Sequence, residues 1–167
     1  MSNSAPIYYL TWEELHRDSR ALAAALIAHG GNWQGIIGIA RGGLIPAAII
    51  GRELNIRLID SLCIASYDHD RQGDATILTD INSLKGIEGD GTGWLIIDDL
   101  VDTGNTAKLV RELLPKATLA TVYAKPKGKA LADIFVREFE QDVWIHFPWD
   151  ITHTYSEPLV TGRDLIP

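Results

Sequence analysis

Short apolar segments bounded by glycine alternate along this chain with segments of helical periodicity, and this alternation is the strongest constraint on its fold. Residues 35–40 read Gly-Ile-Ile-Gly-Ile-Ala, which is typical of a strand buried on both faces. Before them, leucines recur at helical spacing between Thr11, which can cap a helix, and Gly30, which can end one. Repeated strand–helix units of this kind predict an α/β fold with a central, mostly parallel sheet flanked by helices.

The remaining elements follow from the same two patterns. Further helices are expected over 44–54 and 105–114, a short strand over 76–78, and longer strands over 57–64, 94–97, 118–124 and 134–139. In a sheet of this kind, ligands bind beyond the carboxyl ends of the strands, where the strand order reverses. The loops that follow the strands are therefore the places to search for a site.

The length of 167 residues fits one domain over 1–167, and the charge argues against a protein that binds nucleic acid in general. With 22 acidic and 15 basic residues the formal net charge is −7, whereas binding to nucleic acid requires a basic surface. The single cysteine, Cys63, allows no intramolecular disulfide and favours a reducing, cytoplasmic setting. Neither a signal peptide nor a membrane-spanning stretch is visible in the sequence.

A polar, glycine-rich segment over 66–93 separates two of the expected strands. A loop of this length within a compact domain is usually a functional lid or disordered. We therefore expect a lid loop at about 66–93. The tail at 164–167 has no role that its residues indicate.

The segment 95–107, Leu-Ile-Ile-Asp-Asp-Leu-Val-Asp-Thr-Gly-Asn-Thr-Ala, carries most of the chemistry. A buried strand is expected to end in the adjacent carboxylates Asp98 and Asp99, and a turn over 102–106 then leads into a helix. Free N–H groups and hydroxyls at a helix N-terminus can hold a phosphate. The neighbouring carboxylates suit hydroxyl groups or a divalent cation. Together these features predict a phosphorylated sugar as the ligand.

Other interpretations of this segment are weaker. A lone Asp-Thr-Gly would more often be a helix cap than a site, but the whole thirteen-residue combination reverses that balance. It is not a Walker A loop, since no Gly-Lys-Ser/Thr follows, nor a dinucleotide fingerprint, since the glycines at 89–93 precede the strand. In a receiver-type signalling module the acid pair would follow the first strand, which here is followed by Arg41-Gly42-Gly43.

The segment resembles the phosphoribosyl-diphosphate signature of the type I phosphoribosyltransferases. Four further blocks resemble the bacterial purine members of that family, at 40–44, 66–70, 124–126 and 144–150. The resemblance covers about residues 7–163. It implies the family's fold, with a small hood formed by the N- and C-terminal segments and a long flexible lid loop. It also implies a homo-oligomer, often a tetramer, in the cytoplasm or loosely attached to the inner membrane.

The resemblance implies a purine salvage reaction. A 6-oxopurine (guanine, xanthine or hypoxanthine) and 5-phosphoribosyl 1-diphosphate give a nucleoside monophosphate and pyrophosphate, with Mg²⁺ as cofactor. Asp102 would lie near N7 of the purine and act as general acid and base. Asp99 would belong to the metal shell. The residues implied to bind the ribose and its 5-phosphate are Asp98, Asp99, Asp102, Thr103, Gly104, Asn105 and Thr106.

The purine would be read by residues from two later segments. The resemblance implies that Lys125 donates to the 6-oxo group, and that Trp144 stacks on the purine face. The main chain at Trp144 and Ile145 would contact the 2-position of the base. A lysine or a tryptophan taken alone is more often a solvated or a core residue, so these roles depend on the resemblance.

The diphosphate is assigned to two loops. Arg41, Gly42 and Gly43 follow the first strand of the sheet and offer backbone N–H groups and a guanidinium group. The family often has a non-proline cis peptide in this loop, which would fall between Ala40 and Arg41. In the lid, Arg71 either reaches the pyrophosphate from a shifted register or is an ordinary loop arginine, because the family's arginine would fall two residues further on.

Two other functions are compatible with the same fold. One is an enzyme that prefers hypoxanthine, and the other is a non-catalytic regulator that binds phosphoribosyl diphosphate and acts on RNA or DNA. The regulator needs a basic face, which the net charge of −7 disfavours. Attachment to a membrane has no support from an amphipathic basic helix.

Overall fold

The computed structural model describes residues 5–66, 75–79, 84, 86–87 and 89–150. Its centre is a six-stranded sheet in the order β4-β3-β2-β5-β6-β7, in which only β4 is antiparallel to its neighbour. The strands are β2 (Gly35–Ala40), β3 (Ile59–Ser66), β4 (Ala75–Ile77), β5 (Trp94–Val101), β6 (Thr118–Ala124) and β7 (Ile134–Glu138). The expected mostly parallel sheet is confirmed.

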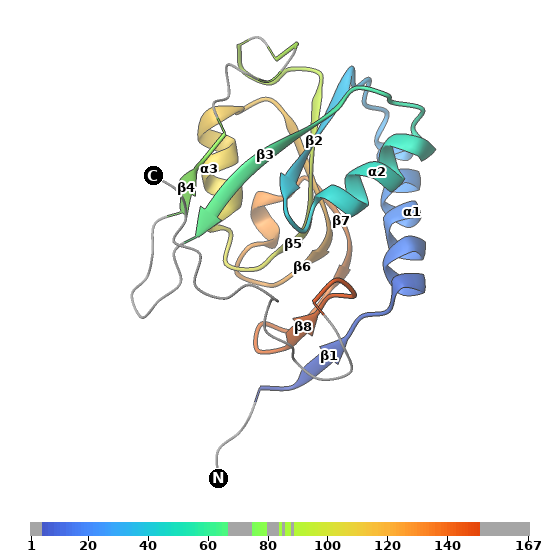
Figure 1. Ribbon diagram of the computed structural model, residues 1–167, viewed down its shortest axis with the longest axis vertical. Coiled ribbons are helices and arrows are strands. Elements are labelled where there is room, and N and C mark those ends of the chain that lie inside the picture. Colours follow the sequence, from blue (N-terminus) through green and yellow to red (C-terminus); the bar gives the residue numbers. More distant parts are fainter. Residues whose placement is uncertain (1–4, 67–74, 80–83, 85, 88, 151–167) are drawn as a thin grey trace.

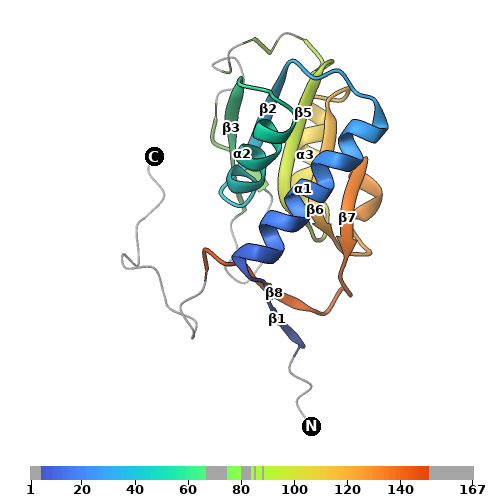
Figure 2. The same cartoon turned by 90° about the vertical axis from the view of Figure 1, so that its right-hand side faces the viewer.

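Helices cover both faces of this sheet (Figures 1 and 2). Helices α1 (Trp12–His29) and α2 (Leu44–Glu53) lie on one face, and α3 (Asn105–Leu113) lies on the other, with a 3-10 turn, η2 (Lys129–Leu131), after β6. Consecutive strand residues point to opposite faces, so Ile36 joins the core under α1 while Ile37 joins the core under α3. The uninterrupted apolar run in β2 is thus explained by burial on both sides.

Helix α1 has the boundaries that its sequence predicts. The Thr11 side chain accepts a hydrogen bond from the Glu14 N–H at 3.1 Å, and the Glu14 carboxylate accepts one from the Thr11 N–H at 3.0 Å. This reciprocal capping box satisfies two amides at the start of the helix. At the other end Gly30 adopts the left-handed conformation, with φ of 81°, that closes many helices.

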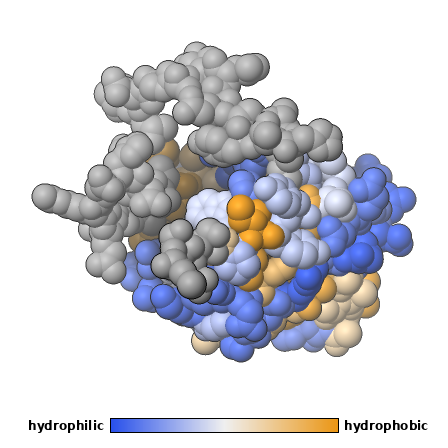
Figure 3. All heavy atoms as spheres, turned by 90° about the horizontal axis from the view of Figure 1, so that it is seen from below, coloured by the Kyte–Doolittle hydropathy of each residue, from blue (hydrophilic) through white to orange (hydrophobic). Residues whose placement is uncertain are grey.

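A second, two-stranded sheet forms a hood at one end of the molecule (Figure 1). Strands β1 (Ile7–Tyr9) and β8 (Trp144–His146) pair in parallel, with Ile7 opposite Trp144. Both of these residues are exposed, and the view from this end shows hydrophobic residues bordered by hydrophilic ones (Figure 3). The expected hood is confirmed for the described residues, although neither short strand was predicted from sequence.

Four strands differ in their limits from the prediction. Strand β5 continues four residues beyond the expected end, β3 begins and ends two residues later, β4 begins and ends one residue earlier, and β7 ends one residue earlier. Strand β4 pairs with the end of β3 within the segment that the sequence assigns to the lid. Residues 67–74 of that lid and the tail at 164–167 lie outside the described residues.

The strand order reverses between β2 and β5. From β2 the chain moves outward to β3, whereas from β5 it moves the opposite way to β6 and β7. Pairing of β2 with β5 ends at Gly38 and Ile97, but pairing of β5 with β6 continues to Val101. The carboxyl ends of the two central strands therefore separate, which is the arrangement that forms a ligand-binding crevice in α/β sheets.

None of the helices in the described ranges has both the length and the apolar character needed to span a bilayer.

Candidate functional site

Asp98 and Asp99 lie on the part of β5 that no longer pairs with β2. The Asp99 N–H donates to Asp98 Oδ1 at 2.9 Å, and the Leu100 N–H donates to Asp99 Oδ1 at 2.7 Å. The two carboxylates thus accept hydrogen bonds from two backbone N–H groups of β5. The strand was expected to end in this acid pair, but it continues beyond the pair to Val101, because pairing with β6 keeps β5 extended. The pair therefore lies within a strand, and the Asp99 carboxylate lies against the loop that follows β2.

The environment of the pair disfavours two negative charges. Burial raises the pKa of Asp98 well above its ordinary value, and the neighbouring charge of Asp99 raises it further. Burial also raises the pKa of Asp99 to about 6, with a smaller contribution from the charge of Asp150. Across the described segments no lysine, arginine or histidine forms an ion pair with either carboxylate. Both residues stay partly exposed, so a ligand can supply the missing partners.

The loop after β2 packs directly against this pair. The peptide bond between Ala40 and Arg41 is cis, as the sequence resemblance implies. A side chain at Gly42 would overlap the Asp99 carboxylate, and one at Gly43 would overlap the Ile97 carbonyl. Glycine is therefore required at both positions for the loop to approach β5 so closely. Arg41 is exposed, so its guanidinium group is available to an anionic ligand.

The turn after β5 leads into the N-terminus of α3. Gly104 has a φ of 89°, a left-handed conformation that favours glycine, and α3 begins at the next residue. No side chain of the described residues caps this helix. Its first amides and the exposed Thr103 and Asn105, together with the half-buried Thr106, remain available to an anion.

Asp102 lies at the start of the turn and accepts two side-chain hydrogen bonds. Lys125 Nζ donates to its Oδ2 at 2.8 Å, and Gln141 Nε2 donates to its Oδ1 at 2.6 Å. Lys125 is only 4% exposed, and its backbone N–H donates to the Val101 carbonyl at 2.9 Å. The lysine that the sequence assigns to the purine is thus held beside the carboxylate that it assigns to proton transfer. An ammonium group has three protons, so Nζ retains donors for a ligand.

The two residues of the hood that the resemblance assigns to the purine lie on β8. Trp144 is 63% exposed, and its N–H donates to the Pro6 carbonyl at 2.8 Å, which fixes the strand to the N-terminal segment. Ile145 is buried beneath it. An exposed indole on a fixed strand is suitable for stacking on a planar ligand. Arg71 lies outside the described residues.

Two residues near these groups were not singled out from the sequence. Gln141 contacts Asp102, and the charge of Asp150 acts on Asp99. Asp150 belongs to a block that resembles the family, so the motif itself contained a signal. Gln141 lies in a polar turn whose position is set by tertiary contacts, and nothing in its sequence context distinguishes it from a surface glutamine.

The model of one protein family, described as the phosphoribosyl transferase domain, matches residues 9–156. That match covers most of the chain and includes every described group of the site.

The chain belongs to the phosphoribosyltransferase family.

Curated members of this family are similar over nearly the full length of this phosphoribosyltransferase. The xanthine-guanine phosphoribosyltransferase of Desulfotalea psychrophila is 55% identical over 158 residues, which cover 94% of either chain. The protein of the same name from Chromohalobacter salexigens is 54% identical over 153 residues, covering 92% of this chain and 90% of its own.

Solved phosphoribosyltransferase structures share the fold. The purine phosphoribosyltransferase of Pyrococcus horikoshii superposes with a TM-score of 0.70 at 30% identity, covering 90% of this chain and 99% of its own. The xanthine-guanine-hypoxanthine phosphoribosyltransferase of Helicobacter pylori superposes with a TM-score of 0.71 at 22% identity, covering 87% and 94%. The α/β architecture with its hood is therefore that of the family.

Proposed function

We propose that this phosphoribosyltransferase acts in purine salvage, transferring the phosphoribosyl group of 5-phosphoribosyl 1-diphosphate to guanine, xanthine and hypoxanthine. One observation carries the proposal. Among the described residues, an acid pair without a cationic partner, a glycine loop and an uncapped helix N-terminus lie where the strand order reverses. This combination suits a sugar that carries a phosphate group at each end and hydroxyl groups between them. The similarity to enzymes named for xanthine and guanine supports the choice of bases.

The sugar would bind along the carboxyl end of β5. Asp98 and Asp99 accept hydrogen bonds from the ribose 2- and 3-hydroxyls, which suits carboxylates that lack other partners. The 5-phosphate occupies the α3 N-terminus, where the helix dipole favours negative charge. The phosphate-binding residues of this turn are Asp102, Thr103, Gly104, Asn105 and Thr106.

The diphosphate would lie on the loop of Arg41, Gly42 and Gly43. This loop contacts Asp99, so the leaving group and the ribose hydroxyls share one wall of the crevice. Backbone amides and the Arg41 guanidinium group offset the charge of the departing pyrophosphate. Arg71 is a further candidate for this role.

Mg²⁺ fits the same wall. Asp99 offers hard oxygen ligands, and its raised pKa of about 6 indicates a carboxylate that a nearby cation would stabilise in its charged form. The described residues contain no group of three or more acidic, histidine or cysteine side chains that would enclose a metal. Asp99, assisted by Asp98, would therefore hold the ion together with substrate oxygens. When bound, the ion neutralises part of the diphosphate charge.

The base would lie between Lys125 and the hood. The Lys125 ammonium group donates to the 6-oxo group, which selects 6-oxopurines over adenine, since adenine has an amino group there. Trp144 stacks on the base, and the main chain at Trp144 and Ile145 contacts its 2-position. Asp102 then accepts or returns the proton at N7 of the purine.

Assembly and location are proposed alongside this activity. We propose a single domain that forms a homo-oligomer, a tetramer, in the cytoplasm. The single cysteine is consistent with a reducing compartment. Light scattering on the purified protein measures the mass of the assembly, and a monomer would contradict the proposal.

A panel of bases tests the function directly. The purified protein is incubated with 5-phosphoribosyl 1-diphosphate, Mg²⁺ and one base at a time, and nucleotide formation is measured by chromatography. We expect conversion of guanine, xanthine and hypoxanthine and none of adenine. Fast adenine turnover would overturn the assignment, and strong preference for hypoxanthine would select that alternative. Binding of the sugar diphosphate without any turnover would indicate a regulator.

A single variant tests the proton-transfer step. Asp102→Asn keeps the shape and the hydrogen-bonding oxygen but removes the proton acceptor, so kcat should fall by about 10²–10⁴-fold. Nucleoside monophosphate should still bind in calorimetry. Full activity of this variant would remove Asp102 from the mechanism.

A further inference from the structure

Gln141 lies in the turn between β7 and β8 and uses both ends of its side-chain amide. Its Oε1 accepts a hydrogen bond from the Lys127 N–H at 2.9 Å, and its Nε2 donates to Asp102 Oδ1 at 2.6 Å. The first contact fixes the orientation of the amide. Since the oxygen is committed to a backbone N–H, the NH₂ group is left to face the carboxylate.

The two donors hold the Asp102 carboxylate from different sides. Lys125 donates to Oδ2 from the end of β6, and Gln141 donates to Oδ1 from the turn that precedes the hood. The carboxylate is not enclosed, because the side chain of Asp102 remains 44% exposed. It can therefore contact a ligand while its two oxygens stay fixed in direction.

The chain connects this contact to the hood within three residues. Val143 N–H donates to the Glu140 carbonyl at 3.2 Å and closes the turn around Gln141, and Trp144 then begins β8. The residue proposed to stack on the base and the residue that contacts Asp102 thus belong to one short segment closed by a backbone hydrogen bond. Movement of this turn would displace both together.

We propose that Gln141 is a positioning residue, which aims the Asp102 carboxylate at the purine and couples that aim to the placement of the hood. The proposal rests on the proposed function, since it assumes that Asp102 transfers the proton. A correctly directed acceptor matters because small displacements of a catalytic group cost large factors in rate.

A purely structural role for Gln141 makes a different prediction. In that case only the bond from the Lys127 N–H matters. Gln141→Glu separates the two roles, because a carboxylate still accepts from that N–H but cannot donate to Asp102 when ionised. Gln141→Leu removes both contacts. The matched control is Gln34→Glu, the same change at an exposed glutamine near the opposite end of the sheet.

Steady-state kinetics with guanine compare these variants. We expect kcat to fall about tenfold in Gln141→Leu and further in Gln141→Glu, as the loss of a hydrogen bond to a charged group implies. KM for the sugar diphosphate should stay within about twofold, because Gln141 acts on proton transfer and not on sugar binding. Gln34→Glu should match the unmodified protein. Normal kcat in Gln141→Glu, with or without loss in Gln141→Leu, would overturn the proposal.

A direct view of the carboxylate separates failure of this proposal from failure of the proposed function. In protein labelled with ¹³C at aspartate carboxyls, the Asp102 resonance is identified by its loss in Asp102→Asn. It should move in both Gln141 variants and stay in Gln34→Glu, with thermal melting used to verify folding. If the Asp102 resonance moves while no 6-oxopurine reacts, the contact between Gln141 and Asp102 is confirmed and the proposed function is wrong. If turnover is normal and the resonance does not move, positioning by Gln141 is wrong.

Discussion

Two pairs of acids in this protein have opposite surroundings. Where the hood joins the core, Glu14 and Asp18 accept hydrogen bonds from side chains of β1, α1 and β6. Within the part of the chain that the structure describes, Asp98 and Asp99 accept hydrogen bonds only from backbone N–H groups of their own strand. The first group is complete without a ligand and the second is not. This difference separates the acids that hold the fold together from those that we propose bind the substrate.

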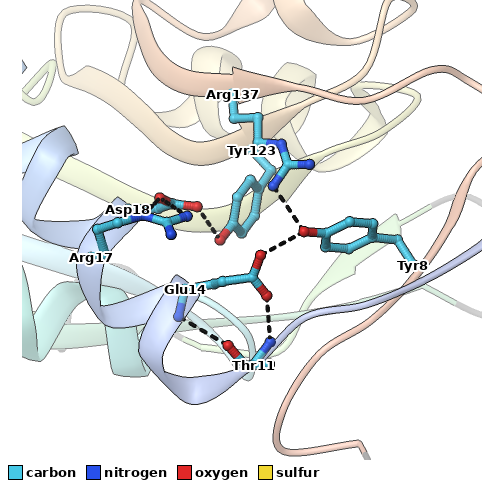
Figure 4. A network of polar contacts seen from close by, with 7 residues as sticks. All are labelled: Tyr8, Thr11, Glu14, Arg17, Asp18, Tyr123 and Arg137. Atoms are coloured by element: carbon cyan, nitrogen blue, oxygen red, sulfur yellow. Dashed lines mark hydrogen bonds and ion pairs between the residues drawn. The ribbon is translucent and has the colours of Figure 1, made fainter.

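The junction with the hood is a closed polar network (Figure 4). Tyr8 of β1 donates to Glu14 Oε1 at 2.6 Å and accepts from Arg137 at 3.1 Å, while the Arg137 guanidinium group lies 4.8 Å from the centre of the Tyr8 ring. The hydrogen bond from Tyr8 is the largest cause of the lowered pKa of Glu14. Here the protein itself stabilises the charged form of the acid.

The second acid of the junction is more deeply buried. Asp18 is 5% exposed. Its carboxylate accepts a hydrogen bond from the Tyr123 hydroxyl at 2.9 Å and forms an ion pair with the Arg17 guanidinium group at 2.8 Å. Burial raises the pKa of Tyr123, so its hydroxyl stays a donor at any working pH. The contact ties α1 to β6 across the core.

The largest expected effect is on activity at the open pair. Asp99→Asn keeps the size of the side chain but removes the charge proposed to hold the ribose and the metal. We expect kcat/KM with guanine to fall by about 100-fold, as for other misplaced substrates. Asp142→Asn, the same change at an exposed position of the turn between β7 and β8, should leave kcat/KM unchanged. Equal activity of the two variants would end the distinction drawn above.

The next effect is on stability at the closed junction. Tyr123→Phe removes the donor to a buried carboxylate and should lower the free energy of unfolding by about 2 kcal/mol. The melting temperature should fall by roughly 4–8 °C for a chain of this size. Tyr9→Phe, at an exposed tyrosine, serves as the control. A junction that tolerates Tyr123→Phe without loss would not be the anchor that its geometry indicates.

A third variant should raise the free energy of unfolding instead of lowering it. The folded-state pKa of Asp99 is raised from 3.8 to about 6, so its folded state binds a proton more tightly than the unfolded chain does. This contribution to stability is complete below pH 4 and is lost as the pH rises from about 4 to about 6. Asp99→Asn should therefore stabilise the protein by up to about 3 kcal/mol at pH 7 and by little at pH 4. Chemical denaturation at the two pH values measures the difference, and a constant difference would contradict it.

The smallest effect concerns Glu14, whose pKa is lowered. Its contribution to stability is present above the unfolded-state pKa of 4.5 and is lost as the pH falls through the folded-state value. Tyr8→Phe should cost about 0.5–1 kcal/mol at pH 7. The cost should shrink on acidification below about pH 4, the reverse of the trend for Asp99. Parallel denaturation curves at both pH values would show that the two acids do not differ in this way.

Much of the fold is predictable because its elements carry local signals. The capping residues of α1 and the glycine-bounded run of β2 set their limits without help from the rest of the chain. The end of β5 was missed because it depends on pairing with β6, which the segment itself does not encode. Strands β1 and β8 have three residues each and stabilise one another across more than 130 positions, so neither carries enough periodicity to be seen alone.

The candidate site also contains features that the sequence predicts and one that it does not. The acid pair and the turn that we propose binds phosphate are contiguous in sequence, and one motif predicts the chemistry of both. The cis peptide at Ala40–Arg41 was expected from resemblance alone, and the structure contains it. The contact between Lys125 and Asp102 brings together residues 23 positions apart and is visible only after folding.

The contact between Gly42 and Asp99 has an evolutionary consequence. Since the Asp99 carboxylate occupies the space that a methyl group at position 42 would need, alanine at 42 is excluded only while a side chain of that length stays at 99. Substitutions at the two positions should therefore occur in a fixed order: a shorter side chain must replace Asp99 before alanine can replace Gly42. A mutational scan of position 42 alone would report intolerance that a library varying positions 42 and 99 together would show to be conditional.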